Sequence, residues 1–151
     1  MTPDKEEILN VLKQVESIAA LAGLRGDIEM DHLRFRMAFD VGHGRSHVVY
    51  VRVIGKTPDS KTVVSLFAAA RTLTKGMFSG LGREQALELL RLNETTLFAR
   101  FGLWDGPKEM MIVASLDTLI DTLDADEMRT YALYVSHAAD AYEAKHGGDA
   151  F

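Results

Sequence analysis

Residues 33–54 read LRFRMAFDVGHGRSHVVYVRVI, and this stretch decides the fold. Apolar residues take alternate positions in Leu33–Asp40 and again in His47–Ile54, which predicts two strands that each bury one face. The glycine-rich segment Gly42–Ser46 between them predicts a five-residue hairpin loop. The cross-strand pairs expected from this loop are Phe39 with Val49, Met37 with Val51 and Phe35 with Val53.

The outer face of this hairpin carries three arginines, Arg34, Arg36 and Arg52. The predicted register sets Arg36 opposite Arg52, and two facing cations favour an acid between them. We expect these arginines to form a protein-binding surface for an acidic peptide or for the acidic segment Asp117–Glu127 of a second copy of the chain. The alternative is an acid of the same chain, such as Glu29 or Asp31.

Hydrophobic periodicity outside the hairpin predicts three helices and three further strands. The first helix is predicted to start at Thr2 with Pro3, or at a second possible capping pair, Asp4 with Glu7, and to end at Gly23 and Gly26. The further predicted elements are a strand over Thr62–Ala70, a helix over Arg83–Leu92, strands over Thr95–Leu103 and Lys108–Leu116, and a last helix starting at the capping box of Asp124 and Glu127. Short links within each strand group make those strands antiparallel. We expect one α+β domain over residues 1–151, with helices flanking a five-stranded antiparallel sheet whose central strand is Thr62–Ala70.

Composition limits the classes of function. The 151 residues include 17 basic and 22 acidic side chains, and the net charge of −5 argues against nucleic-acid binding. The absence of cysteine excludes disulfides, thiol catalysis and cysteine-ligated metal. The longest uncharged run, Thr130–Ala139, is shorter than the roughly 20 residues that span a bilayer. With no signal-peptide pattern at the start, we expect a cytoplasmic protein without membrane association.

Charge is divided unevenly along the chain. Residues 1–75 hold 11 bases and 9 acids, a balance of +2, and residues 76–151 hold 6 bases and 13 acids, a balance of −7. Five of these acids lie in Asp117–Glu127 without a base among them. Such a segment can orient a partner or a second copy of the chain, or it can simply be a solvated helix start.

The second half of the chain resembles the type III secretion chaperone-like superfamily. The segment Leu89-Leu90-Arg91-Leu92-Asn93 is similar to the leucine pair and asparagine that end the middle helix in that group. A strand, the turn Asp105-Gly106 and another strand follow. The last helix carries Ala139-Asp140-Ala141-Tyr142, which is closer to the YbjN-type, sensory-transduction-regulator branch.

The resemblance implies a small, acidic, cytoplasmic bacterial protein that is a homodimer and binds protein segments without catalysis. In the resembled fold the middle helix and the following strand commonly supply the dimer surface. The residues expected there are Leu87, Leu90, Leu97 and Phe101.

The histidines, glycines and serines give weak signals for chemistry. His43 and His47 flank a turn and His32 precedes the first predicted strand, but zinc normally needs four close ligands, so we interpret them as surface residues. Gly76, Gly80 and Gly82 match neither a P-loop nor a dinucleotide fingerprint. Two Ser-His dipeptides, Ser46-His47 and Ser136-His137, bring a hydroxyl and an imidazole together in the sequence. Neither lies in a nucleophile-elbow motif, so we do not expect them to be catalytic.

We therefore expect no catalytic residue, no metal and no cofactor. The sequence predicts a non-enzymatic, chaperone-like or regulatory domain that binds an unknown protein partner. Two alternatives remain open: a signalling module that senses a ligand, and a small-molecule-binding protein that uses the concave face of the sheet.

Overall fold

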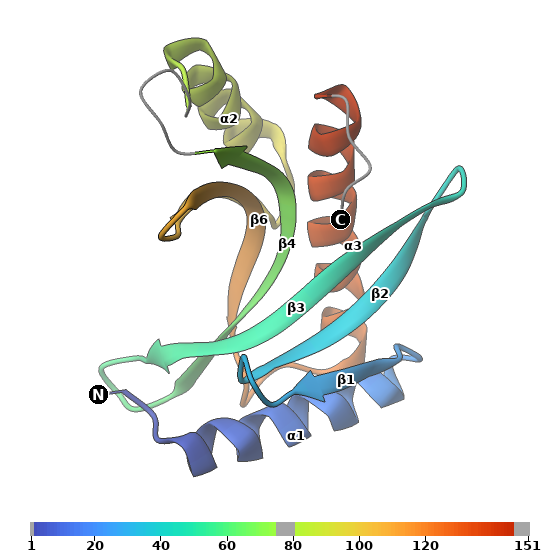
Figure 1. The fold of residues 1–151 in the computed structure, drawn as a ribbon. Coiled ribbons are helices and arrows are strands. Elements are labelled where there is room, and N and C mark those ends of the chain that lie inside the picture. The colour runs from blue at the N-terminus through green and yellow to red at the C-terminus, as the bar shows by residue number, and fades with distance from the viewer. Residues whose placement is uncertain (1, 75–80, 147–151) are drawn as a thin grey trace.

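The computed structural model describes residues 2–74 and 81–146, and Figure 1 shows its fold. The elements are α1 (Lys5–Leu21), β1 (Gly26–Glu29), β2 (Arg34–Gly42), β3 (Arg45–Lys56), β4 (Thr62–Thr74), α2 (Arg83–Thr95), β5 (Arg100–Asp105), β6 (Glu109–Leu119) and α3 (Ala125–Lys145). Within these residues the strands form one antiparallel sheet in the order β1-β2-β3-β4-β6-β5. The predicted α+β class with a central β4 is confirmed.

The sheet has six strands in the described part of the chain, and the prediction of five was wrong. The missed strand is β1, whose four residues hold only one large apolar side chain, Ile28. Gly26 was predicted to end the first helix, but it opens this strand. A Cβ at Gly26 would lie 2.3 Å from the backbone oxygen of Arg36 and 2.6 Å from a ring carbon of Phe35, so the strands can approach only at a glycine.

The hairpin of β2 and β3 has a shorter turn than predicted. His43 and Gly44 form its tip with φ angles of 55° and 73°, the left-handed backbone that two-residue hairpin turns require. The register therefore differs from the predicted one by two residues: Phe39 faces His47, Met37 faces Val49 and Phe35 faces Val51. Because the shift is an even number, the buried face stays the same.

Of the two predicted starts of α1, the capping pair of Asp4 and Glu7 is the one that forms, and Thr2 with Pro3 lies before the helix. The carboxylate of Asp4 accepts a hydrogen bond from the backbone nitrogen of Glu7 at 2.8 Å, and α1 ends before Gly23, whose φ is 75°. Asp124 and Glu127 form the predicted capping box of α3.

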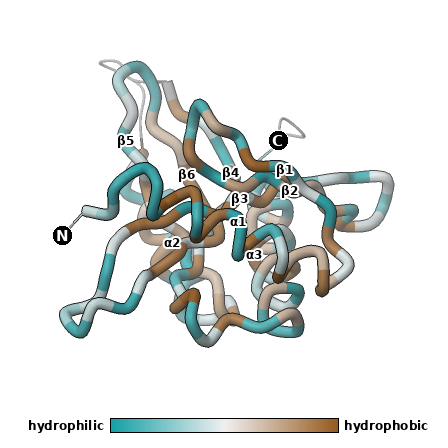
Figure 2. Tube along the Cα trace, turned by 90° about the horizontal axis from the view of Figure 1, so that it is seen from below, coloured by the Kyte–Doolittle hydropathy of each residue, from teal (hydrophilic) through white to brown (hydrophobic). Residues whose placement is uncertain are grey.

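Helices α1 and α3 cover one face of the sheet and enclose the core (Figure 1). The largest fully buried side chains are Phe35, Leu12, Met37, Leu66, Ile112, Met128, His47, Val15, Val49, Val51, Val64 and Val113. Figure 2 shows hydrophobic stretches of the central strands gathered in the middle of the molecule. None of the described helices is long and apolar enough to cross a membrane. The opposite face of the sheet carries no described helix and is the open face in Figure 1.

The strand predicted over Thr95–Leu103 begins only at Arg100. Thr95 ends α2, and Phe98 adopts a φ of 63°, which interrupts an extended backbone despite the alternating apolar pattern. After this break, β5 forms the edge of the sheet beside β6.

Asn93 covers part of that edge. Its side-chain oxygen accepts a hydrogen bond from the backbone nitrogen of Phe101 at 2.6 Å, and its side-chain nitrogen donates to the backbone oxygen of Phe101 at 3.1 Å. The amide thus takes the place of a neighbouring strand at one position and fixes the end of α2 to β5. The asparagine of the Leu-Leu-Arg-Leu-Asn segment therefore has a structural role, which is to hold α2 against the edge strand β5.

Candidate functional site

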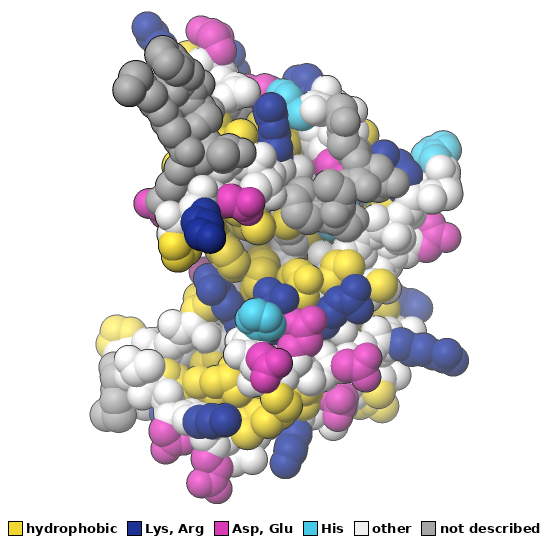
Figure 3. Space-filling model, viewed as in Figure 1, with side chains coloured by type: hydrophobic (Ala, Val, Ile, Leu, Met, Phe, Trp, Pro, Cys, Tyr) yellow, Lys and Arg dark blue, Asp and Glu magenta, His cyan; other side chains and the backbone are white. Residues whose placement is uncertain are grey.

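The three arginines predicted as a binding surface lie on the open face of the sheet. Arg36 faces Tyr50 across β2 and β3, so the predicted pairing of Arg36 with Arg52 was wrong; the two-residue turn is the cause. Arg52 instead faces Ser65 of β4. In Figure 3, which views this side of the molecule, hydrophobic side chains occupy the hollowed middle with several basic side chains around them.

Three aromatic rings form the floor between these arginines. Tyr50 and Phe67 face each other across β3 and β4 and stack with centroids 5.3 Å apart. Trp104 of β5 lies 4.4 Å from the Phe67 ring by centroid. Phe67 is buried, although no described helix covers this side of the sheet. The rings therefore cover one another.

Two guanidinium groups lie against these rings. The guanidinium carbon of Arg34 is 3.8 Å from the Tyr50 ring centroid, and that of Arg52 is 3.9 Å from Trp104 and 5.2 Å from Phe67. Such cation–π contacts contribute about 0.5–2 kcal/mol each. We call Arg34, Arg36 and Arg52 together with these three rings the arginine–aromatic face.

Acids of the same chain neutralise part of this charge. Arg34 forms an ion pair with Glu29, one of the two acids expected, and Arg36 lies 3.9 Å from the same carboxylate. The Arg36 side chain remains 44% exposed. Arg34 is therefore paired with an acid of its own chain, which was the alternative to a partner's acid. Arg36 is left partly exposed to solvent.

Arg52 is half-buried, and its environment changes the pKa of its guanidinium group. Burial lowers the pKa of its guanidinium, and the nearby carboxylate of Asp117 acts in the opposite direction. The group still carries its charge at neutral pH, because arginine does not deprotonate in proteins. Its Nε is buried and has no hydrogen-bond partner among the described residues. A buried charged donor without a partner costs free energy, which a bound acceptor would recover.

A hollow of about 550 Å³ opens above this floor. Its lining residues are Arg34, Arg36, Val48, Tyr50, Phe67, Ala69, Trp104 and Met111. A second hollow, of about 510 Å³, lies at the turn between β5 and β6 and is also lined by Trp104 and Met111. Trp104 therefore separates two adjoining hollows.

The predicted dimer residues differ in exposure. Leu90 and Leu97 are 66% and 61% exposed, and their neighbour Phe98 is 49% exposed. Leu87 is half-buried. Phe101 packs against the core, with its ring centroid 5.5 Å from that of Tyr142.

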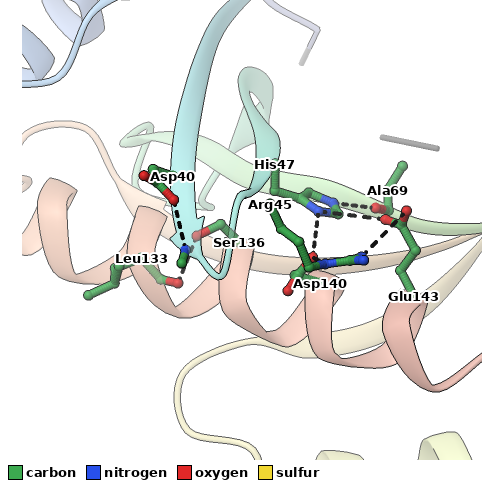
Figure 4. Close-up of polar contacts among 9 residues, drawn as sticks. Asp40, Arg45, His47, Ala69, Leu133, Ser136, Asp140 and Glu143 are labelled. Atoms are coloured by element: carbon green, nitrogen blue, oxygen red, sulfur yellow. Dashed lines mark hydrogen bonds and ion pairs between the residues drawn. The ribbon is translucent and has the colours of Figure 1, made fainter. Parts of the chain in front are cut away.

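His47 is fully buried, and its interpretation as a surface residue was wrong. Its Nε2 donates to the backbone oxygen of Ala69 at 2.6 Å, and its Nδ1 lies 3.7 Å from a carboxylate oxygen of Glu143 (Figure 4). Arg45 joins the cluster through Asp140, with 2.8 Å between Nε and Oδ1. The alternation that buries Val49 and Val51 extends back to His47 and contained this signal.

This polar cluster connects the β2–β3 hairpin and β4 to the last turns of α3, so we assign it a structural role. His43 is exposed at the turn, as expected. His32 is also exposed, and the described residues contain no group of three potential metal ligands. Gly76 and Gly80 lie outside the described residues.

Neither Ser-His dipeptide forms a nucleophile–base pair. The Ser136 hydroxyl is buried and donates to the backbone oxygen of Leu133 at 2.9 Å, while His137 is exposed. Ser46 is exposed, but His47 points into the core cluster. Among the described residues, the arginine–aromatic face is therefore our candidate functional site.

Comparison of the chain with protein-family models finds no match, and comparison with curated proteins finds none either.

Proposed function

We propose that this protein is a non-enzymatic binding domain, chaperone-like or regulatory, that holds an acidic segment of a partner protein on the arginine–aromatic face. The observation that supports this most is the pair of guanidinium groups that lie over the Tyr50 and Trp104 rings on an uncovered sheet face. Stacking fixes the orientation of a guanidinium, so its remaining donors can bind a carboxylate with little further loss of entropy.

Charge favours an acidic occupant. Arg36 is largely exposed with only a distant acid, and Arg52 has a buried Nε without a partner among the described residues. A partner carboxylate would supply the acceptor that these donors lack.

The rings argue for a polypeptide over a single-stranded nucleic acid. Base recognition on a sheet needs ring faces onto which bases stack. Here the Tyr50 and Trp104 rings already lie against Arg34 and Arg52. Glu29 beside these arginines and a net charge of −5 would further oppose a phosphate backbone.

A small anionic ligand is the second candidate. The first hollow has a volume of about 550 Å³, within the roughly 300–1,000 Å³ usual for ligand sites. Arg34 and Arg36 in its lining give such a ligand charged anchors. This candidate corresponds to the ligand-sensing alternative.

We further propose that the domain is a homodimer. Leu90, Leu97 and Phe98 are large exposed apolar side chains at the end of α2 and the approach to β5, where water contact is unfavourable. Leu90→Glu combined with Leu97→Glu should convert a dimer into a monomer, measured by light scattering at tens of micromolar. A wild-type monomer under these conditions would contradict this part of the proposal.

The binding function can be tested by selecting random displayed peptides on the purified domain. Selected peptides should be rich in Asp and Glu, and Arg52→Gln should abolish the selection. Arg91→Gln is the matched control, because Arg91 is an exposed arginine of α2 that does not belong to the arginine–aromatic face. Selection without acidic enrichment, or selection unaffected by Arg52→Gln, would overturn the proposal. Tighter binding of a single-stranded oligonucleotide than of any acidic peptide would do so as well.

A further inference from the structure

The two hollows beside Trp104 differ in chemistry. The first is bordered by Arg34 and Arg36. The second lies beyond Trp104 and has no arginine in its lining: the Trp104 ring, Pro107 and Met111 supply apolar walls, and Asp105, Lys108 and Glu109 are its charged lining residues. Because Trp104 and Met111 line both, an occupant can pass from one hollow to the other across a single indole ring.

We infer that the segment bound by the proposed function is bipartite: it places an acidic side chain at the arginines and an apolar side chain in the second hollow, crossing Trp104 between them. This inference rests on the proposed function and names its ligand more closely. A partner with only acids would leave the apolar walls at Pro107 and Met111 in water. A partner with only apolar residues would bring no acceptor to the exposed Arg36 or to the Arg52 Nε.

The ring spacing sets the distance between the two anchors. Centroid steps of 5.3 Å from Tyr50 to Phe67 and 4.4 Å from Phe67 to Trp104 separate the ring below Arg34 from the ring that borders the second hollow. An extended chain rises about 3.3 Å per residue, so about three residues cover this distance and one more carries the chain past the Trp104 ring. The partner segment should therefore carry its acid and its apolar residue about four positions apart.

Trp104 is the sole tryptophan of the chain, so its fluorescence reports directly on this site. We would titrate the protein with three synthetic peptides of equal length. The first carries glutamates followed, four positions on, by a leucine pair; the second replaces the leucines by serine; the third replaces the glutamates by glutamine.

The bipartite peptide should bind at least about tenfold more tightly than either single-anchor peptide, the effect of withdrawing a leucine side chain from water. Pro107→Asp, which adds a charge only in the second hollow, should reduce bipartite binding to the level of the serine peptide and leave serine-peptide binding unchanged. Far-UV circular dichroism of the variant confirms that it folds. A benzophenone residue in place of one leucine should crosslink within residues 104–111.

The outcomes separate the two proposals. Equal affinity for the bipartite and serine peptides, or crosslinks outside residues 104–111, would overturn the bipartite ligand while the acidic-segment function stands. Absence of any Arg52-dependent binding by either glutamate peptide would overturn both.

Discussion

Asn93 should stabilise the domain by closing the exposed edge of β5, and replacing it with alanine measures this contribution. Asn93→Ala removes a 2.6 Å bond from the Phe101 nitrogen and a 3.1 Å bond to the Phe101 oxygen, both partly buried. A typical hydrogen bond contributes about 0.5–1.5 kcal/mol net, so the pair is worth about 2 kcal/mol. For a domain of this size that loss lowers the melting temperature by about 4–8 °C.

Urea denaturation gives the free energy of unfolding, and amide hydrogen exchange locates the effect. Because Phe101 directs its backbone groups away from β6, its neighbour Gly102 directs its own toward β6. The Phe101 amide should lose about tenfold or more of its protection in Asn93→Ala, while Gly102 keeps most of its protection. Glu94→Ala, an exposed change at the next position, is the control and should stay within about 0.5 kcal/mol.

A loss no larger than that of Glu94→Ala, or unchanged exchange at Phe101, would refute the edge-closing role. Exposure of the edge also makes a measurable side effect possible, because an unpaired strand edge can recruit another chain. Light scattering of Asn93→Ala should accordingly show more self-association than the control.

Three further perturbations test other parts of the structure. Gly26→Ala should lower the free energy of unfolding by about 1–3 kcal/mol, because its Cβ would meet a backbone oxygen at 2.3 Å. Gly102→Ala is the control: its Cβ would have nothing within 4 Å, so the variant should be neutral or slightly stabilising in the same urea assay. The hydrogen bond from Lys145, with help from His146, holds the pKa of Glu88 below its usual value, so its contribution is present above the unfolded-state pKa and is lost as pH falls through the folded-state pKa. Glu88→Gln should therefore lower stability at pH 7 by no more than about 1 kcal/mol and make no difference in acid, which thermal melts across pH would show; an equal deficit at both pH values would contradict it. His47→Leu should cost about 2 kcal/mol or more by thermal or urea unfolding, because it leaves buried acceptors without their donor, whereas His43→Gly at the turn should change little; equal effects would argue against the buried cluster.

The sequence was sufficient to predict elements with strong periodicity. The β2–β3 alternation, the central position of β4 and the capping box of α3 all follow from local patterns, and the structure confirms them. β1 was missed because four residues around one apolar side chain carry no periodic signal, and its place depends on Gly26 fitting against β2.

Register errors had larger consequences for the site than for the fold. The predicted loop and the real turn differ by an even number of residues, so the same side chains are buried and the fold is unaffected. The partners on the outer face nevertheless change, and Arg36 faces Tyr50 in the register instead of Arg52. Hydrophobic patterns determine which face is buried, but the detailed neighbours on the polar face depend on turn geometry.

The contact between Phe67 and Trp104 explains why the hollow itself could not be predicted. In the sheet register Phe67 pairs with Ser115 of β6, whereas Trp104 pairs with Met111, yet the two rings lie 4.4 Å apart. Such a contact needs strong curvature of the sheet. A register irregularity between Ala69 and Arg71 of β4 provides a bend, and Figure 1 shows β4 and β6 curving in this region.

The bend follows from pairing across β4 and β6, and the three alanines before Arg71 give no local sign of it. Small side chains there permit the strands to curl, and curling carries Trp104 over the floor that Phe67 and Tyr50 form. The same displacement brings Arg52 onto the indole ring and divides the open face into two hollows. The arginines alone thus indicated the location of the proposed binding surface, whereas its hollows arise from sheet curvature, a property that no single strand encodes.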